Sequence, residues 1–253
     1  MKIITLNLWG GIVYEPLLEF IKKHSMETDI FCFQEVLFGD VPGVTEIHKA
    51  RMNLFTEVSA NLSDFIAYKY ISNTTHFQRE PINFKGGQAI FVRKSIPVKE
   101  SGGLCSYENL PGDAVMGSKI TGNMNWVNIG LGDEHFIIAN LHGIHQAGTD
   151  ALDTPERLFQ SEKINNFLSI NEGKQILCGD FNLNPNGKSI QILGKGMRNL
   201  ITENRIASTR SSFYTRNNKC SDYVLVSWDV EVKDFKVLQD QVSDHLPIFA
   251  EFV

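Results

Sequence analysis

The stretch QILCGDFNLNP, residues 175–185, passes from an apolar run directly into a polar one. Its first part is typical of a short buried strand, and Asp180 and Asn182 follow at once after a glycine. In layered folds, the end of a buried strand is a common position for catalytic side chains. A single Asp or Asn in this position is more often a turn or capping residue. The stretch is therefore informative only if the pattern recurs.

The same transition from apolar to polar residues recurs at other predicted strand ends. The polar residues found there are Asn7, Gln34, Glu35, Asn140, His142, Asp222, Ser243, Asp244 and His245. Ends of neighbouring strands meet at one edge of a sheet, and these residue types suit one chemical task. We therefore expect them to meet in one site.

The residue types indicate the chemistry of that site. Carboxylate and amide oxygens suit magnesium or manganese, with water completing the octahedron, and no soft ligand set favours zinc. A His beside an Asp provides an oriented imidazole for proton transfer or charge stabilisation. An Asp that holds a water, beside an Asn that donates to an oxyanion, is the minimum for hydrolysis of a phosphate ester.

Composition limits the class of protein. The 253 residues are 42% hydrophobic and 21% charged, which is ordinary for a globular protein. The net charge of -5 argues against tight binding dominated by phosphate contacts, without excluding a nucleic-acid enzyme. The four cysteines are scattered and indicate neither a disulfide framework nor a zinc site. We find no membrane-spanning run and no signal peptide in MKIITLNLWGG, so we expect a cytoplasmic protein.

Periodicity predicts about ten strands and few helices. The expected strands are 2–9, 29–36, 65–70, 86–94, two within 124–143 joined at Gly132 and Asp133, 175–179, 222–228, 230–238 and 247–253, and the expected helices are 15–24, 45–62 and 154–170. The last helix has Thr154 as its N-cap and Pro155 at its first position. Many strands with flanking helices indicate a layered α/β or α+β sandwich.

Several motifs, taken in order, resemble one superfamily. They are TLNLWG (5–10), FQEV (33–36), NLHG (140–143), GDFN (179–182), SDYVLVS (221–227) and SDHLPI (243–248). Together they resemble the endonuclease/exonuclease/phosphatase superfamily, with a deoxyribonuclease-I-like fold, over residues 3–250. The resemblance implies one domain over residues 1–253. It also implies a four-layered α/β sandwich, in which two mainly antiparallel sheets pack face to face with helices outside.

The resemblance also implies a metal site. Glu35 matches the family's direct metal ligand, and Asn7 matches a ligand that acts directly or through water. Asp244 matches the Asp that approaches the metal. The expected cofactor is Mg²⁺, with Mn²⁺ as the other candidate.

Five further residues match catalytic positions of the family. Asp180 resembles the Asp that orients or deprotonates the attacking water, and Asn182 the Asn that binds a non-bridging phosphate oxygen. His142 matches a His or Tyr that touches the phosphate. His245 resembles the His that stabilises or protonates the transferring phosphate, and Asp222 the Asp that fixes its tautomer. Which residue is the acid and which the base stays open.

Three residues are candidates for substrate binding, each with a plainer alternative. Trp9 is either a core aromatic or a wall of the cleft. Arg157, near the start of the predicted helix 154–170, either is solvated or reaches a substrate phosphate. Arg210 lies in STRSSFYTR (208–216), where basic and aromatic residues alternate as they do around a nucleotide or lipid headgroup, or on an ordinary exposed strand.

One departure from the family pattern concerns His142. In pancreatic-type deoxyribonucleases, a Glu on the strand that here reads GGQAIFVR pairs with the matching His. The present strand has Gly86, Gly87 and Gln88 and no carboxylate. The orientation of His142 must therefore come from elsewhere.

These observations predict a Mg²⁺-dependent phosphodiester hydrolase, in the first place a nuclease acting on DNA or RNA by in-line attack of water. The first alternative is a phosphatase or phosphodiesterase for a small or lipid-linked phosphate. The second is a binding module without catalysis. The partner implied is the phosphoester substrate alone, with neither membrane insertion nor a protein partner. Substrate choice is expected to lie in the loops 72–88, 101–123 and 143–153.

Overall fold

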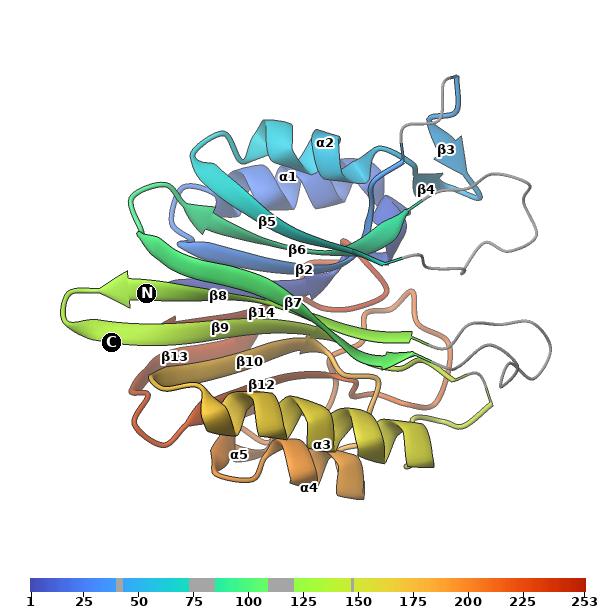
Figure 1. Ribbon diagram of the computed structural model, residues 1–253. Coiled ribbons are helices and arrows are strands. Elements are labelled where there is room, and N and C mark those ends of the chain that lie inside the picture. The colour runs from blue at the N-terminus through green and yellow to red at the C-terminus, as the bar shows by residue number, and fades with distance from the viewer. Residues whose placement is uncertain (40–42, 73–84, 109–120, 147) are drawn as a thin grey trace.

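The computed structural model describes residues 1–39, 43–72, 85–108, 121–146 and 148–253. These residues form two six-stranded sheets that pack face to face, with helices on both outer surfaces (Figure 1). The four-layered α/β sandwich predicted from the sequence is confirmed.

The first sheet has the strand order β13-β14-β1-β2-β6-β5. β1 and β2 run parallel and the other neighbours antiparallel. Helices α1 (Tyr14–His24) and α2 (Leu54–Asn61) cover its outer face (Figure 1). The strands are β1 (Lys2–Asn7), β2 (Ile30–Leu37), β5 (Phe65–Ser72), β6 (Gly86–Arg93), β13 (Val232–Val237) and β14 (Ile248–Phe252).

The second sheet has the order β11-β12-β10-β9-β8-β7, with β9 and β10 as its parallel pair. Helices α3 (Pro155–Ile170), α4 (Lys188–Leu193) and α5 (Leu200–Glu203) lie on its outer side (Figure 1). The Thr154 hydroxyl accepts a hydrogen bond from the Arg157 amide, which confirms the predicted N-cap of α3. The strands are β7 (Val98–Glu108), β8 (Thr121–Leu131), β9 (Glu134–His142), β10 (Lys174–Asp180), β11 (Met197–Asn199) and β12 (Asp222–Ser227).

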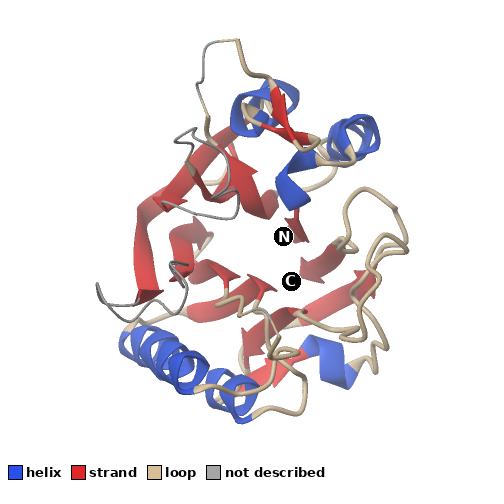
Figure 2. Cartoon of the chain, turned by 90° about the vertical axis from the view of Figure 1, so that its right-hand side faces the viewer, coloured by secondary structure: helices blue, strands red, loops and turns tan. Residues whose placement is uncertain are grey.

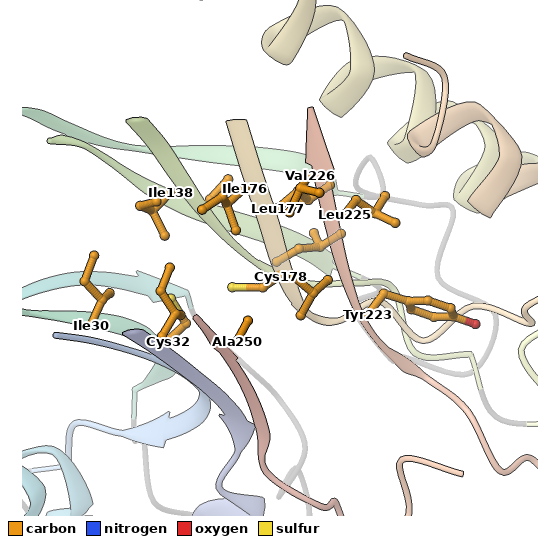
Figure 3. Packing of buried hydrophobic residues seen from close by; sticks show 14 of the residues in the cluster. Ile30, Cys32, Ile138, Ile176, Leu177, Cys178, Tyr223, Leu225, Val226 and Ala250 are labelled. Atoms are coloured by element: carbon orange, nitrogen blue, oxygen red, sulfur yellow. The ribbon is translucent and has the colours of Figure 1, made fainter. Parts of the chain in front are cut away.

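The central strands are apolar on both faces because each face packs against another layer. In β1, Ile3 belongs to the cluster between the two sheets and Ile4 to the cluster beneath α1 and α2. Figure 3 shows the first cluster, in which Cys32 and Ala250 of one sheet lie opposite Cys178 of the other. Both of these cysteines are fully buried, as expected for small core residues.

The helix predicted over residues 45–62 is wrong in its first half. The segment instead forms a short hairpin, β3 (Glu46–Ile47) and β4 (Ala50–Arg51), and only α2 is helical. The turn residues His48 and Lys49 have φ values of 48° and 70°. Left-handed backbone cannot continue a right-handed helix, so the helix begins only after this turn.

Strand β7 was not predicted, because KESGGLCS lacks β-branched residues. Aromatic rings from β8 of the same sheet and from β5 of the other sheet lie against its glycines. A Cβ on Gly102 would lie 2.8 Å from the Trp126 ring, and one on Gly103 would lie 2.0 Å from the Tyr70 ring. The same packing that selects glycine here removes the strand signal from the sequence.

Among the described residues, no helix has the length and apolar character that a membrane crossing requires. Of the loops expected to choose the substrate, residues 73–84, 109–120 and 147 lie outside the described part of the chain.

Candidate active site

The predicted site residues gather at one end of the two sheets, where β1, β9 and β10 end in Asn7, His142 and Asp180. This end of the sheets faces the viewer in Figure 2. The register of β10 explains much of this. Asp180, its last residue, lies opposite His142 of parallel β9 and opposite Asp222 of antiparallel β12. In the first sheet, Asn7 ends β1 beside Gln34 of β2. Residues far apart in the chain therefore meet because their strands end at the same edge.

A cleft of ≈560 Å³ opens at this end, and residues from both halves of the sandwich line it. Asn7 and Asp222 are buried and do not line the cleft, but each is hydrogen-bonded to a residue that does. The predicted residues that line it are Trp9, Glu35, His142, Arg157, Asp180, Asn182, Arg210, Asp244 and His245.

Asn7 links the carboxylates of the two sheets. Its side-chain amide nitrogen donates to Glu35 Oε1 at 3.1 Å and to Asp180 Oδ2 at 3.1 Å. Its oxygen accepts from the backbone amide of Trp9 at 2.9 Å. In this arrangement Asn7 orients both carboxylates.

Glu35 reaches the cleft through an irregularity in β2. The pairing of β2 with β6 shifts register between Phe33 and Val36, and Glu35 has a φ of 53°. A bulge of this kind redirects one side chain, and left-handed backbone in a residue other than glycine costs about 1–3 kcal/mol. Gln34 consequently stays between the sheets, where it donates to Asn140 Oδ1 at 2.6 Å, while Glu35 faces the cleft.

His245 is held by a buried carboxylate. Its Nδ1 lies 2.8 Å from Asp222 Oδ1, which leaves Nε2 directed to Asp180 Oδ2 at 3.6 Å. The other Asp222 oxygen accepts from Thr209 Oγ1 at 2.6 Å and from Ser221 Oγ at 3.1 Å. The roles of Thr209 and Ser221 could not be predicted from the sequence, because a hydroxyl group is recognised as functional only once its hydrogen-bond acceptor is known.

His245 and Asp222 have pKa values that differ from those of the free side chains. Burial and the charge of Arg210 lower the pKa of His245, but the Asp222 carboxylate, with Asp180, more than offsets them and raises it to about 9. Burial raises the pKa of Asp222, yet the charges of His245 and Arg210 bring it below its usual value. The imidazole is therefore positively charged at neutral pH, with Nε2 available as a donor toward the cleft.

We expect Asp222→Asn to change how stability depends on pH. A His with a folded pKa near 9 and an ordinary value of 6.5 stabilises the fold fully below pH 6.5. This contribution is lost as the pH rises through 9. Without the Asp222 carboxylate, burial is opposed by Asp180 alone, so the pKa of His245 falls and the loss of stability over this window becomes smaller. Urea denaturation across the window should show a steeper fall for wild type than for the variant, and equal slopes would contradict the assignment.

Arg210 closes one side of the site. Its side chain is only 7% exposed, and its Nη1 contacts His245 Nε2 and lies 3.5 Å from Asp244 Oδ2. Its guanidinium carbon lies 4.1 Å from the centre of the Tyr214 ring. Residues 208–216 form a loop with a single β-bridge, from Arg210 to His245, so the alternative of an exposed strand is wrong.

Arg157 is 1% exposed, so the alternative of a solvated side chain is wrong. Its Nη1 donates to the Leu152 carbonyl at 2.5 Å and to Thr149 Oγ1 at 2.8 Å, and its Nε donates to the Ile144 carbonyl at 3.4 Å. Arg157 thus holds the loop between β9 and α3 beside the cleft, and contact with a substrate phosphate stays a prediction.

His142 and Asn182 both line the cleft, and each contacts a neighbouring segment. His142 Nε2 lies 3.7 Å from Glu35 Oε1, so a carboxylate from β2 stands where the sequence showed none on β6. Asn182, with a φ of 53°, donates through its side chain to the Gly143 carbonyl at 3.2 Å. Its backbone amide donates to Asp180 Oδ1 at 3.0 Å, which fixes that carboxylate from the side opposite Asn7.

The donor set fits a divalent cation. Glu35, Asp180 and Asp244 all line the cleft, and hard oxygen ligands of this kind suit Mg²⁺ or Mn²⁺. Burial raises the pKa of Asp244, and the neighbouring Glu35 and Asp180 carboxylates raise it further, while His245 and Arg210 act against them. Asp180, Asp222 and His245 also present atoms within 4.8 Å of one another. Because His245 Nδ1 and Asp222 are hydrogen-bonded to each other, we interpret that group as a hydrogen-bonded relay.

Several residues that line the cleft lie outside the set of site residues predicted from the sequence. His48 comes from the β3–β4 turn, a segment whose predicted helix is wrong, and no sequence signal would have placed it. Phe213, Tyr214 and Arg216 come from the basic and aromatic stretch that the sequence singled out.

The model of the Endonuclease/Exonuclease/phosphatase family matches residues 4–245. A comparison with curated protein sequences finds no match.

Solved structures of similar shape cover the whole chain. An endonuclease/exonuclease/phosphatase family protein from Bacteroides thetaiotaomicron is 18% identical, with 94% of its own chain covered and a TM-score of 0.72. A mannosyl-6-phosphatase from the same organism is 19% identical, with 99% covered and a TM-score of 0.70. The human Nocturnin catalytic domain with bound sulfate is 17% identical, with 93% covered and a TM-score of 0.68. At these identities the likeness concerns the fold.

Proposed function

The chain belongs to the endonuclease/exonuclease/phosphatase family of phosphoester hydrolases, and from its cleft we propose that it hydrolyses a small phosphoester with the help of a divalent cation. The observation that carries this proposal is the position of the Asp180 carboxylate. It is held by Asn7 on one oxygen and by the Asn182 amide on the other, and it lies 3.6 Å from His245 Nε2. A fixed carboxylate beside a charged imidazole can orient both a water and a phosphoryl group.

The side chains divide the reaction between them. Asp180 orients a water and accepts its proton as the water oxygen attacks phosphorus in line with the ester oxygen. The P–O ester bond breaks and phosphate forms, and the leaving oxygen departs as an alkoxide that takes a proton from solvent water to become the alcohol. His245 donates from Nε2 to a phosphoryl oxygen, while Asp222 keeps its Nδ1 protonated and its ring in place. His142 lines the same cleft and is placed to contact the phosphate.

Glu35, Asp244 and Asn7 are the residues that we propose for the cation, with Mg²⁺ as the first choice and Mn²⁺ as the second. When bound, such a cation stabilises the charge on the phosphoryl and leaving oxygens. Asn7 also holds Glu35 and Asp180 in fixed orientation toward each other.

The shape of the site favours a small substrate. A cleft of ≈560 Å³ lies within the range of small-molecule sites, and a net charge of -5 does not favour a long polyanion. That a solved structure of the same fold is a mannosyl-6-phosphatase supports this choice. Action on DNA or RNA, the cytoplasmic location, the absence of a protein partner and the single domain over residues 1–253 stay predictions.

The test is hydrolysis by the purified protein with Mg²⁺, with Mn²⁺ and with EDTA. The substrates would be p-nitrophenyl phosphate, bis(p-nitrophenyl) phosphate, sugar phosphates, and single-stranded and duplex DNA. We expect the aryl and sugar esters to be cleaved, the rate to fall to background in EDTA, and excess Mg²⁺ to restore it. Thermal denaturation in EDTA controls for unfolding. An unchanged rate in EDTA would refute the metal proposal, and cleavage of DNA alone would refute the small substrate.

A further inference from the structure

We propose that Arg210 makes this site selective for phosphate monoesters, by binding the non-bridging oxygen that a monoester has and a diester lacks. The inference rests on the proposed function, because it concerns the phosphoryl group that Asp180 and His245 act on. It assigns to one residue of this chain the choice between a terminal and an internal phosphate.

The position of Arg210 is determined by its backbone. Arg210 forms a β-bridge with His245, and the residues on either side are tied down. The Leu246 amide donates to the Thr209 carbonyl at 2.8 Å, and the Ser211 amide donates to the Asp244 carbonyl at 3.1 Å. The Arg210 side chain therefore leaves the backbone directly beside the His245 ring.

The guanidinium of Arg210 is held in position, but its hydrogen-bond donors are not all paired within the described part of the chain. The Tyr214 ring supports its face, and its Nη1 contacts His245 Nε2, which is itself a donor when the imidazole is charged. Its Nε is buried and has no hydrogen-bond partner in the described part of the chain. A guanidinium carries five donors in a rigid fork, so a group with several acceptor oxygens is its natural partner.

Two donors converge on the same point of the cleft. His245 Nε2 is the atom that reaches the phosphoryl group in the proposed reaction, and Arg210 Nη1 contacts that same nitrogen. A phosphoryl oxygen bound by His245 lies within reach of Arg210 as well. Arg210 is always charged, and Arg pairs with phosphate through two parallel hydrogen bonds.

A monoester and a diester differ in what they offer to such a fork. Near neutral pH a phosphate monoester carries up to two negative charges and three non-bridging oxygens, whereas a diester carries one charge and two such oxygens. Arg210 and Tyr214 both line the cleft, with the ring against the guanidinium. The extra charge and the third non-bridging oxygen therefore favour the monoester at this fork.

The competing explanation is that Arg210 only balances charge. The Asp180, Asp222 and Asp244 carboxylates all raise its pKa, against the effect of burial. A role confined to holding the Asp180, Asp222 and Asp244 carboxylates in place affects every substrate in the same way, because it acts through the shape of the site. Selectivity between two esters therefore separates the two explanations.

The experiment compares p-nitrophenyl phosphate with bis(p-nitrophenyl) phosphate, which share a leaving group. The variants are Arg210→Gln and Arg210→Lys, with Arg205→Gln as the control that removes one exposed positive charge outside the cleft. We expect wild type to prefer the monoester. For Arg210→Gln we expect kcat/KM to fall about 100-fold for the monoester and by about tenfold or less for the diester.

The Lys variant keeps the charge without the fork, so its selectivity should lie between wild type and Arg210→Gln. Inorganic phosphate should inhibit Arg210→Gln at least about tenfold more weakly than wild type. Circular dichroism and thermal denaturation confirm that each variant is folded.

Equal falls for both esters in folded Arg210→Gln, or a wild type that prefers the diester, would overturn the role of Arg210 and leave the proposed function intact. Failure of wild type to hydrolyse either ester with Mg²⁺ or Mn²⁺ would overturn the proposed function and this inference with it. A selectivity ratio that falls in Arg210→Gln and not in Arg205→Gln supports the inference.

Discussion

An Asp180→Asn variant will hydrolyse its substrate about 10³-fold more slowly than wild type, or slower still, while keeping its fold. Asparagine has the same size and retains one oxygen to accept from Asn7 or from the Asn182 amide, which both bond Asp180. It has no negative charge with which to take a proton from water. The measurement is kcat at saturating substrate and metal, with thermal denaturation to confirm folding.

Asp133→Asn is the matched control, because it makes the same chemical change on an exposed residue. Asp133 lies in the turn between β8 and β9, at the opposite end of β9 from His142. Its rate should equal that of wild type. A rate for Asp180→Asn within about tenfold of wild type would refute the role given to Asp180. If instead Asp180→Asn is slow but regains the wild-type rate at higher Mg²⁺ concentration, Asp180 is a metal ligand.

Gly179→Ala will lower the free energy of unfolding by about 3 kcal/mol or more and will damage the site with it. Gly179 has a φ of 129°, a backbone conformation that residues with a side chain rarely adopt. A Cβ there would lie 2.1 Å from the Leu141 carbonyl oxygen of β9. Both obstacles are backbone, so neither a rotamer change nor a flexible neighbour can relieve them. Because Asp180 is the next residue, any shift of β10 moves its carboxylate.

Gly132→Ala separates the two causes. Gly132 also has a positive φ, of 60°, but nothing lies within 4 Å of a Cβ placed on it. Its cost should therefore be that of left-handed backbone alone, about 1–2 kcal/mol. Chemical denaturation of both variants gives the comparison. A cost for Gly179→Ala no larger than that for Gly132→Ala would show that the strands adjust, and the argument from close packing would be wrong.

The layered architecture was predictable because its central strands are buried on both faces. Runs such as IFCF in β2 and ILC in β10 are apolar throughout. In β2, alternate residues enter different clusters, with Ile30 and Cys32 between the sheets and Phe31 and Phe33 beneath the helices. The start of α3 at Thr154 and Pro155 was predictable for a local reason, since helix capping depends on a few adjacent residues. Where a local signal was absent or contradicted by packing, as in β7 and the β3–β4 hairpin, the prediction failed.

The polar strand ends were also predictable as a group. Their residue types and order indicated a phosphoester site, and the structure places them at one end of the sheets. The sequence could not show that Asn7 turns its nitrogen to Glu35 and Asp180, because amide orientation depends on all of its neighbours. Nor could it show that Thr209 bonds Asp222 or that Arg210 meets His245, since these contacts span 13 and 35 residues of chain.

By itself, then, the sequence determined the layers of the fold, the family and the chemical types gathered in the site, because hydrophobic periodicity and short motifs are local properties of the chain. The tertiary structure alone decided the β2 bulge that turns Glu35 into the cleft, the burial that commits Arg157 to the loop before α3, and the place of Arg210 against His245. These features arise from the register between strands and from which side chains compete for one space. Strand register and the competition between side chains are both established only when distant segments of the chain pack together.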